Sequence, residues 1–298
     1  MRGNPPPGRF SLRVGTDRIG KGTLSMNHGS EAASLRETLG CPIYNKVLHK
    51  EVGRGELDYE IYVRTQELLA LQPSPDELVV PDEMLFVVIH QTQELWLKCA
   101  AFEAANLVEQ IDRDELFAAL ASLDRVVHIA QVLRDQMRVL DTLSPARFQI
   151  IRRSLGEGSG LQSPGYNQIL TAAAAAGSAL GRLIARRGAT LLDIYRDPDA
   201  HPDLHRLAER FVDWDSAVQG WLVEHFMLVR RTMGVDKSVR ALDGFPTAAL
   251  VGRATKPLFA ELWNVRIEMT QSWSRDGGYA PGERRGAVCP YSGLRAEA

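Results

Sequence analysis

The chain has few cysteines: Cys41, Cys99 and Cys289 are the only three among 298 residues. They lie too far apart for a CxxC metal site, and their odd number does not suit a disulfide framework. Residues 1–10 are rich in proline and glycine and lack the apolar core of a signal peptide. Because free cysteines suit a reducing compartment, we expect a cytoplasmic protein.

The chain also lacks an excess of charge of either sign. Its net charge is -2 and its pI is near 6.4, with basic residues scattered along the sequence. This balance gives no electrostatic reason to bind nucleic acid. We see no stretch that approaches the roughly 20 apolar residues of a membrane span. We therefore expect neither a nucleic-acid nor a membrane partner.

Alternating strand patterns, internal repeats and phosphate-binding glycine motifs are missing as well. Apolar residues instead recur at helical spacing over long segments, which predicts an all-α fold, a single-domain bundle of long helices. We place that domain at residues 41–298, preceded by a flexible arm at 1–40 that is rich in turn-forming residues. The expected helical segments are 59–71, 81–111, 114–141, 145–152, 166–187, 202–234 and 257–271.

His225 is a lone histidine on a strongly apolar helical segment, QGWLVEHFMLV. No other histidine, cysteine or carboxylate pair accompanies it in the pattern of a zinc site. Such a residue is often a core histidine without a ligand. It also suits haem, because haem iron needs only one imidazole on a rigid helix in an apolar pocket. Trp221, one turn earlier, and Phe226 would supply aromatic walls.

His90 lies on another apolar segment, one helical turn after Phe86, so both side chains share a face. This pair either lines a pocket or is part of the core. Arg152 precedes the glycine-rich turn LGEGSG, where a guanidinium can clamp a carboxylate or simply end a helix. Ser159, in that turn, can bind a ligand or cap the next segment. From the sequence alone, the His90–Phe86 pair, Arg152 and Ser159 can each have either a ligand-binding or a structural role.

Six motifs together resemble the tryptophan 2,3-dioxygenase superfamily. The segment DEMLFVVIHQTQELWLK at 82–98 is similar to the family signature DE-(L/M)-LF-x-x-x-HQTSELW-(M/L)-K. Further similar segments follow in the family's order, and the resemblance covers roughly residues 55–270. They are YEIYV (59–63), Ser144-Pro145, RRSLGEGSGLQS (152–163), WLVEH (221–225) and FAELWNVR (259–266).

The resemblance implies a haem-dependent oxygenase that uses O2 and contains haem b. His225 would be the axial ligand of the iron, with Trp221 and Ser159 beside the cofactor. His90 would be the catalytic residue near the indole N–H of a tryptophan-like substrate, and Phe86 would stack on the indole ring.

The family also implies how the amino-acid part of the substrate is held. Arg152 would bind its carboxylate, and Phe148 would line the same region. Tyr59, Tyr62 and Val63 would border the pocket, in this family partly from a neighbouring subunit, which implies a homo-oligomer, a tetramer.

Three positions depart from the family pattern. Phe148 stands where the family has a tyrosine, and Val239, within 237–241, stands where a glycine-rich closing loop has a threonine. Val63 replaces a leucine. Two hydrogen-bonding groups at the amino-acid end are therefore missing, each worth on the order of 1 kcal/mol when buried.

These departures favour a substituted substrate, such as a β-methyltryptophan, and monooxygenation to a 2-oxindole in secondary metabolism. One alternative is tryptophan 2,3-dioxygenation, which cleaves the indole ring to N-formylkynurenine. An alternative of another class is a haem-binding or sensor protein without catalysis.

Overall fold

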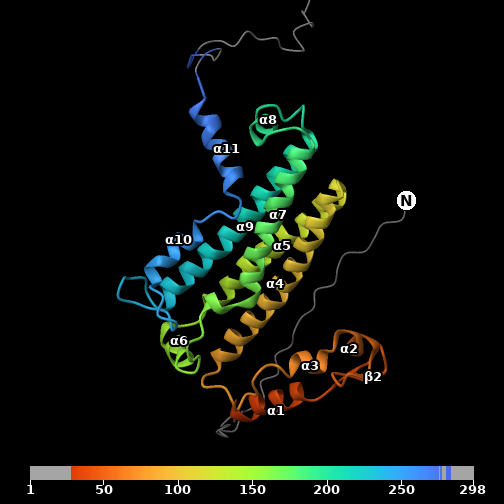
Figure 1. Cartoon of the computed structure of the whole chain (residues 1–298). Helices are drawn as coiled ribbons and strands as arrows, with labels where there is room; N and C mark the ends of the chain where they lie inside the picture. The colour runs from red at the N-terminus through yellow and green to blue at the C-terminus, as the bar shows by residue number, and fades with distance from the viewer. Residues whose placement is uncertain (1–27, 275, 277–279, 283–298) are drawn as a thin grey trace, which may run out of the picture. The chain divides into compact units, whose positions relative to one another are not determined.

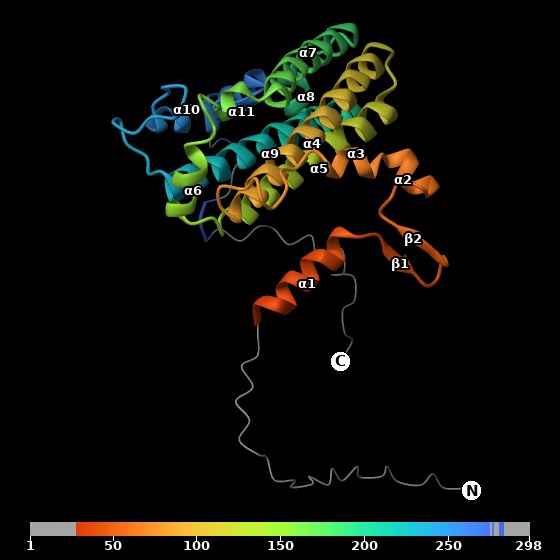
Figure 2. The ribbon, with the colours of Figure 1, turned by 90° about the horizontal axis from the view of Figure 1, so that it is seen from below.

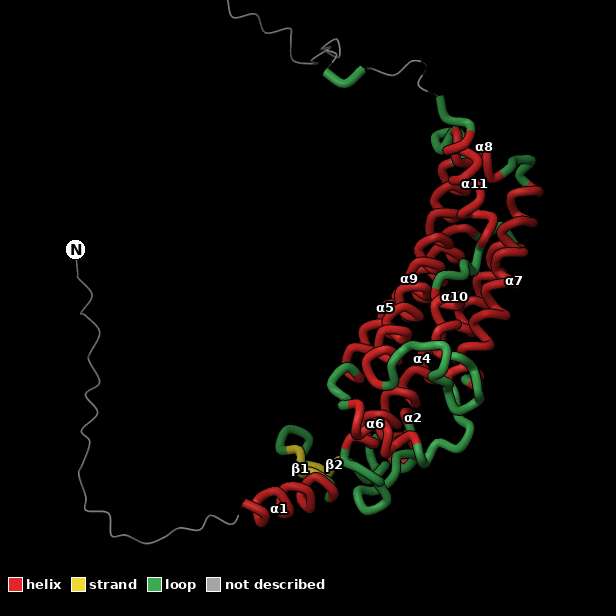
Figure 3. The backbone as a smooth tube through the Cα atoms, turned by 90° about the vertical axis from the view of Figure 1, so that its left-hand side faces the viewer, coloured by secondary structure: helices red, strands yellow, loops and turns green. Residues whose placement is uncertain are grey.

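The computed structural model describes residues 28–274, 276 and 280–282, which divide into two compact units, Met1–Leu71 and Gln72–Ala298 (Figure 1). Among the described residues the secondary structure is almost entirely helical, and the two short strands of the first unit form the one sheet (Figure 3). The all-α prediction is therefore confirmed.

The N-terminal unit contains more structure than its sequence pattern predicted. Residues 28–40 of the expected arm form a helix, while residues 1–27 lie outside the described residues. An antiparallel hairpin that the sequence did not predict follows, with Ile43 opposite Val52. The expected helical segment at 59–71 is two short helices, because Arg64 adopts a left-handed backbone conformation with φ 58°. The elements are α1 (His28–Gly40), β1 (Ile43–Asn45), β2 (Lys50–Val52), α2 (Asp58–Val63) and α3 (Thr65–Leu69).

Four long helices form the framework of the C-terminal unit, and they run side by side in Figures 1 and 2. In chain order these helices are α4 (Asp82–Asp112), α5 (Leu116–Leu140), α7 (Pro164–Arg186) and α9 (Pro202–Thr232). Helix α5 packs against α4 and α9, and helix α7 packs against α4. The apolar stripes of the four helices meet in one continuous core that includes Leu107, Leu123, Leu183 and Phe211.

The start of α7 is held against the middle of α4. Ser163 caps α7 by accepting a hydrogen bond from the backbone N–H of Tyr166, 3.0 Å away. Glu94 of α4 accepts bonds from the Ser163 hydroxyl and from the backbone N–H of Gly165. A Cβ at Gly165 would lie 2.6 Å from Cβ of Leu97, so only glycine allows this close approach. The contact fixes the segment before α7 beside α4.

The shorter elements lie around the four long helices. Ser144 caps α6 (Pro145–Arg152) by accepting from the N–H of Arg147, so this helix has the expected bounds. Helix α11 begins three residues later than expected. The remaining elements are η1 (Gly160–Gln162), α8 (Leu191–Arg196), η2 (Thr247–Ala249), α10 (Leu250–Ala254) and α11 (Ala260–Gln271).

Asp215 anchors α11 to α9 and is completely buried. Its carboxylate accepts hydrogen bonds from Gln219, from the backbone N–H of Phe259 at 3.0 Å and from the indole N–H of Trp263 at 2.8 Å. The FAELW motif therefore has a structural role, because two of its N–H groups satisfy this buried carboxylate.

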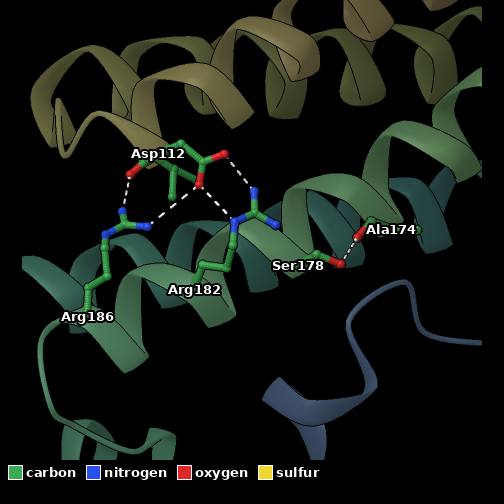
Figure 4. A network of polar contacts seen from close by, with 6 residues as sticks. Asp112, Ala174, Ser178, Arg182 and Arg186 are labelled. Atoms are coloured by element: carbon green, nitrogen blue, oxygen red, sulfur yellow. Dashed lines mark hydrogen bonds and ion pairs between the residues drawn. The ribbon is translucent and has the colours of Figure 1, made fainter.

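An arginine pair joins the end of α4 to the end of α7 (Figure 4). Arg182 donates two hydrogen bonds to Asp112, at 3.0 and 2.6 Å, and Arg186 donates to the carbonyl of Ile111 at 2.6 Å. Because these side chains are exposed, water screens the pairing and it contributes little to the stability of the fold. It fixes the alignment of the two helices at one end of the bundle.

Helices α5 and α7 are apolar enough by length and composition to cross a membrane, with mean hydropathies of 1.5 and 1.3 over their most apolar windows. The expectation that no stretch approaches this composition is therefore wrong. The finding is weak evidence for a membrane, because the core helices of a bundle meet the same criterion, and the buried faces of both helices belong to the core. The absence of a membrane partner stays a prediction.

Candidate functional site

A largely apolar cavity of about 1510 Å³, its open mouth included, lies in the C-terminal unit. Its walls come from α4, α5, α6, α7, α9 and α10, from the glycine-rich turn after α6 and from the loop after α9. Seven of the residues that the sequence singled out line it together, although up to 139 positions separate them. They are Phe86, His90, Phe148, Arg152, Ser159, Trp221 and His225.

The imidazole of His225 lies in the interior of this cavity. Burial, together with the nearby His90, lowers its pKa to about 4, so the ring is neutral near pH 7. Among the described residues, no group hydrogen-bonds to this ring. A neutral imidazole with a free nitrogen is the form that binds a metal ion.

Two further observations bear on whether haem fits beside His225. A Cβ at Gly160 would lie 3.7 Å from Nε2 of His225, so the glycine-rich turn borders the free nitrogen. Trp221 lines the same cavity and is 6% exposed, yet its indole N–H has no hydrogen-bond acceptor. A buried unsatisfied donor in a ligand cavity suits a bound group with an acceptor. The donor set and the apolar wall fit haem held by one histidine.

His90 faces the cavity from α4. Its Nδ1 lies 2.6 Å from the carbonyl oxygen of Phe86, which assigns the proton to Nδ1 and leaves Nε2 as an acceptor. Burial lowers its pKa below 6.5, and this effect outweighs the carbonyl bond and Glu94, which act in the opposite direction. His90 is therefore neutral at pH 7 and offers an acceptor nitrogen to a ligand N–H.

Aromatic rings form one wall beside His90. The Phe86 ring lies 4.1 Å from the His90 ring and 6.2 Å from the Phe148 ring, between ring centres. Phe148 packs in a small apolar cluster with Val80 and Ile151. It lines the cavity and has no polar group to donate, so the departure from the family pattern at this position falls within the cavity wall.

Arg152 and Ser159 both bond to the loop after α9. Arg152 Nη2 donates to the carbonyl of Arg240 at 2.7 Å, and the Ser159 hydroxyl donates to Asp243 at 2.6 Å. Ser159 also accepts from the backbone N–H of Leu161, so it caps η1. Both readings that the sequence left open for Ser159 thus remain compatible with its position, because a capping serine also lines the cavity.

Loop 236–247, which contains the stretch at 237–241, has its own hydrogen-bonded structure. Val239 does not line the cavity; its carbonyl accepts bonds from the backbone N–H of Thr247 at 3.0 Å and from its hydroxyl at 3.2 Å. Asp236 accepts from the backbone N–H and hydroxyl of Ser238. The loop is therefore braced internally without the family's threonine.

Sequence reasoning missed several polar residues of the cavity, namely Glu94, Asp243 and Arg253. Glu94 stands in the signature at 82–98, where its spacing, one turn after His90, was an available signal. Asp243 and Arg253 lie in a loop and a short helix without periodicity, so only the fold brings them to the cavity.

Tyr59, Tyr62 and Val63 belong to the N-terminal unit, on α2. They are 71%, 90% and 39% exposed there. Large exposed apolar and aromatic side chains on a small unit are available for contact with another surface. Their expected place at the border of the pocket stays a prediction.

The sequence of this chain is similar to those of known proteins. A family model described as tryptophan 2,3-dioxygenase matches residues 45–172. The tryptophan 2,3-dioxygenase of Burkholderia pseudomallei (strain 668) is 30% identical, over 72% of this chain and 88% of the relative. That of Burkholderia orbicola (strain MC0-3) is also 30% identical, over 72% and 83%.

The chain belongs to the tryptophan 2,3-dioxygenase family. It is accordingly a haem-dependent oxidoreductase, and its cofactor is haem b with iron.

Proposed function

We propose that the protein uses O2 to oxidise the indole ring, at C2 and C3, of tryptophan or a substituted tryptophan such as a β-methyltryptophan. The observation that carries this proposal is the placement of two neutral imidazoles, His225 and His90, in one apolar cavity on different helices. His225 would bind the iron, and His90 would bind the substrate.

His225 would hold the iron of haem, which supplies the O2 chemistry when bound. Trp221 would offer its unsatisfied N–H to that group. The Nδ1–H of His90 donates a hydrogen bond to the carbonyl oxygen of Phe86, so Nε2 carries no proton. This Nε2 would accept a hydrogen bond from the indole N–H of the substrate. The phenyl rings of Phe86 and Phe148 would pack on the indole and exclude water from it.

Arg152 would bind the carboxylate of the substrate. It lines the cavity, and its bond to the Arg240 carbonyl uses Nη2 alone, so other guanidinium N–H groups are available to a carboxylate. Tyr59, Tyr62 and Val63 would complete the pocket of a neighbouring chain in a homotetramer. That assembly, the single catalytic domain at 41–298 and a cytoplasmic location are part of this proposal.

For the product we propose monooxygenation to a 2-oxindole: one atom of O2 enters the indole ring, and the other leaves as water with two electrons and two protons from an external reductant. Phe148 lines the cavity and lacks the hydroxyl of the family pattern, so the amino-acid end is held by one hydrogen bond fewer and the site can accept a substituted substrate. Ring cleavage to N-formylkynurenine is the second candidate, and the name of the relatives favours it.

Oxygen labelling separates the two products. The haem-loaded protein is reduced without O2 and mixed with tryptophan or β-methyltryptophan and an excess of a two-electron reductant such as ascorbate, and then ¹⁸O2 is admitted. One labelled atom in an oxindole supports the proposal, and two labelled atoms in a formylkynurenine contradict it in favour of ring cleavage. If neither product forms from either substrate while haem is bound, the non-catalytic haem-binding alternative replaces both.

A further inference from the structure

The loop after α9 presents one carboxylate to the cavity, that of Asp243. Its two oxygens are held separately: Oδ2 accepts from the hydroxyl of Ser159 at 2.6 Å, and Oδ1 accepts from the backbone N–H of Phe245 at 2.9 Å. Because a carboxylate has about four acceptor positions, both oxygens can accept further hydrogen bonds.

Asp243 carries its negative charge at pH 7. The hydrogen bond from Ser159, the N–H of Phe245 and the guanidinium of Arg253 lower the pKa of this carboxyl, in spite of the opposing effect of burial. Among the described residues, Asp243 forms no ion pair within contact distance. The guanidinium of Arg253 instead stacks on the ring of Phe245, 5.1 Å from its centre.

The same loop connects this carboxylate to Arg152. Arg152 donates to the carbonyl of Arg240 at 2.7 Å, only three residues before Asp243. Arg152 is bonded to this loop and Asp243 belongs to it, and both line the cavity, so a positive and a negative group face the same cavity. An α-amino acid carries the complementary pair of charges on two groups that are bonded to the same carbon atom.

We propose that Asp243 binds the ammonium group of the amino-acid substrate, and that Ser159 is the positioning residue that orients its carboxylate. This inference rests on the proposed function and deepens it by naming what selects an amino acid over other indoles. It also gives the loop a polar contact to the substrate that does not depend on a threonine at position 239.

A purely structural role for Asp243 predicts a different result. The bond from the Phe245 N–H to Oδ1 is a local turn contact, which asparagine can also make. Asp243→Asn therefore keeps the turn, and its amide NH2 can donate to the Ser159 hydroxyl in place of the bond that Oδ2 accepts, but it removes the charge. An effect that depends on the ammonium group of the ligand then reports recognition, whereas an effect on all ligands reports loop structure.

The test compares two ligands on the haem-loaded full chain by titration calorimetry without O2. The ligands are L-tryptophan and indole-3-propionate, which has the carboxylate but no ammonium group. Because water partly screens a charge-assisted hydrogen bond to this exposed carboxylate, Asp243→Asn should weaken L-tryptophan binding by about five-fold. Its affinity for indole-3-propionate should stay equal or rise.

Asp236→Asn is the matched control, since Asp236 also braces this loop but does not line the cavity. It should change neither affinity by more than about two-fold. Equal losses for both ligands in Asp243→Asn, or no loss for L-tryptophan, would overturn the inference. That failure leaves the proposed function standing if the wild-type protein oxidises an indole amino acid with O2. If the wild-type protein binds haem but neither binds nor oxidises any indole amino acid, the proposed function and this inference both fall.

Discussion

The indole N–H of Trp263 donates a hydrogen bond to Oδ2 of the completely buried Asp215, 2.8 Å away, across the contact between α11 and α9. The backbone N–H of Phe259 donates to the same oxygen at 3.0 Å. These bonds hold the start of α11 on the bundle, where Phe259 packs at 4.9 Å, between ring centres, from Phe211.

Replacing Asp215 with alanine should destabilise the protein by about 3 kcal/mol, because it leaves two buried N–H donors without an acceptor. The free energy of unfolding is measured by urea denaturation, followed by circular dichroism. Asp213→Ala, which removes an exposed ion pair with Arg210, is the control and should cost less than about 1 kcal/mol. Equal effects of the two substitutions would contradict the anchoring role of Asp215.

Gly165→Ala should destabilise the contact between α4 and α7. The new Cβ would lie 2.6 Å from Cβ of Leu97 and 2.8 Å from Oε2 of Glu94, so the helices must separate. We expect a cost of about 1–3 kcal/mol in the free energy of unfolding. Gly181→Ala in the same helix meets nothing within 4 Å and should stabilise by about 0.5–1 kcal/mol. A melting temperature that rises in both variants would show that the close approach at Gly165 is not required.

Oxidation of the substrate should depend on pH through His90. Burial lowers the pKa of His90, so the ring takes up a proton only at a lower pH than an ordinary histidine does. The added proton occupies Nε2, which then can no longer accept from the indole N–H. kcat/KM should therefore decrease along an acid limb whose midpoint lies below pH 6.5.

His90→Asn keeps an amide acceptor that does not titrate, so this variant should be slower but should lack that limb. The measurement is kcat/KM from O2 consumption between pH 5 and 8, a range chosen to bracket the histidine pKa. An acid limb that remains unchanged in His90→Asn would assign the titration to another group.

Much of the bundle could be predicted from the sequence, because hydrophobic periodicity reports which face of a helix is buried. The helix expected at 145–152 has those bounds, and the pattern at 81–111 is α4, Asp82–Asp112. The hairpin at 43–52 was missed because each of its strands has three residues, too few to show alternation. Helix α1 was missed because its residues are mostly exposed and carry no apolar stripe.

The cavity could be predicted only in part. His90 and Phe86 lie one turn apart on α4, so their contact follows from helix geometry. The approach of Asp243 to Ser159, 84 positions away, depends on how a loop without periodicity folds back on the glycine-rich turn. Long-range polar contacts of this kind leave no local pattern in the sequence.

The central claim is that His225 holds the haem iron. The direct measurement is resonance Raman and absorption spectroscopy of the ferrous, haem-loaded protein and of His225→Gly, with and without added imidazole. We expect an iron–histidine band in the wild-type protein, its loss in His225→Gly and its recovery with imidazole, whereas His128→Gly, an exposed control on α5, should match the wild type. An unchanged iron–histidine band and haem content in His225→Gly would contradict the account.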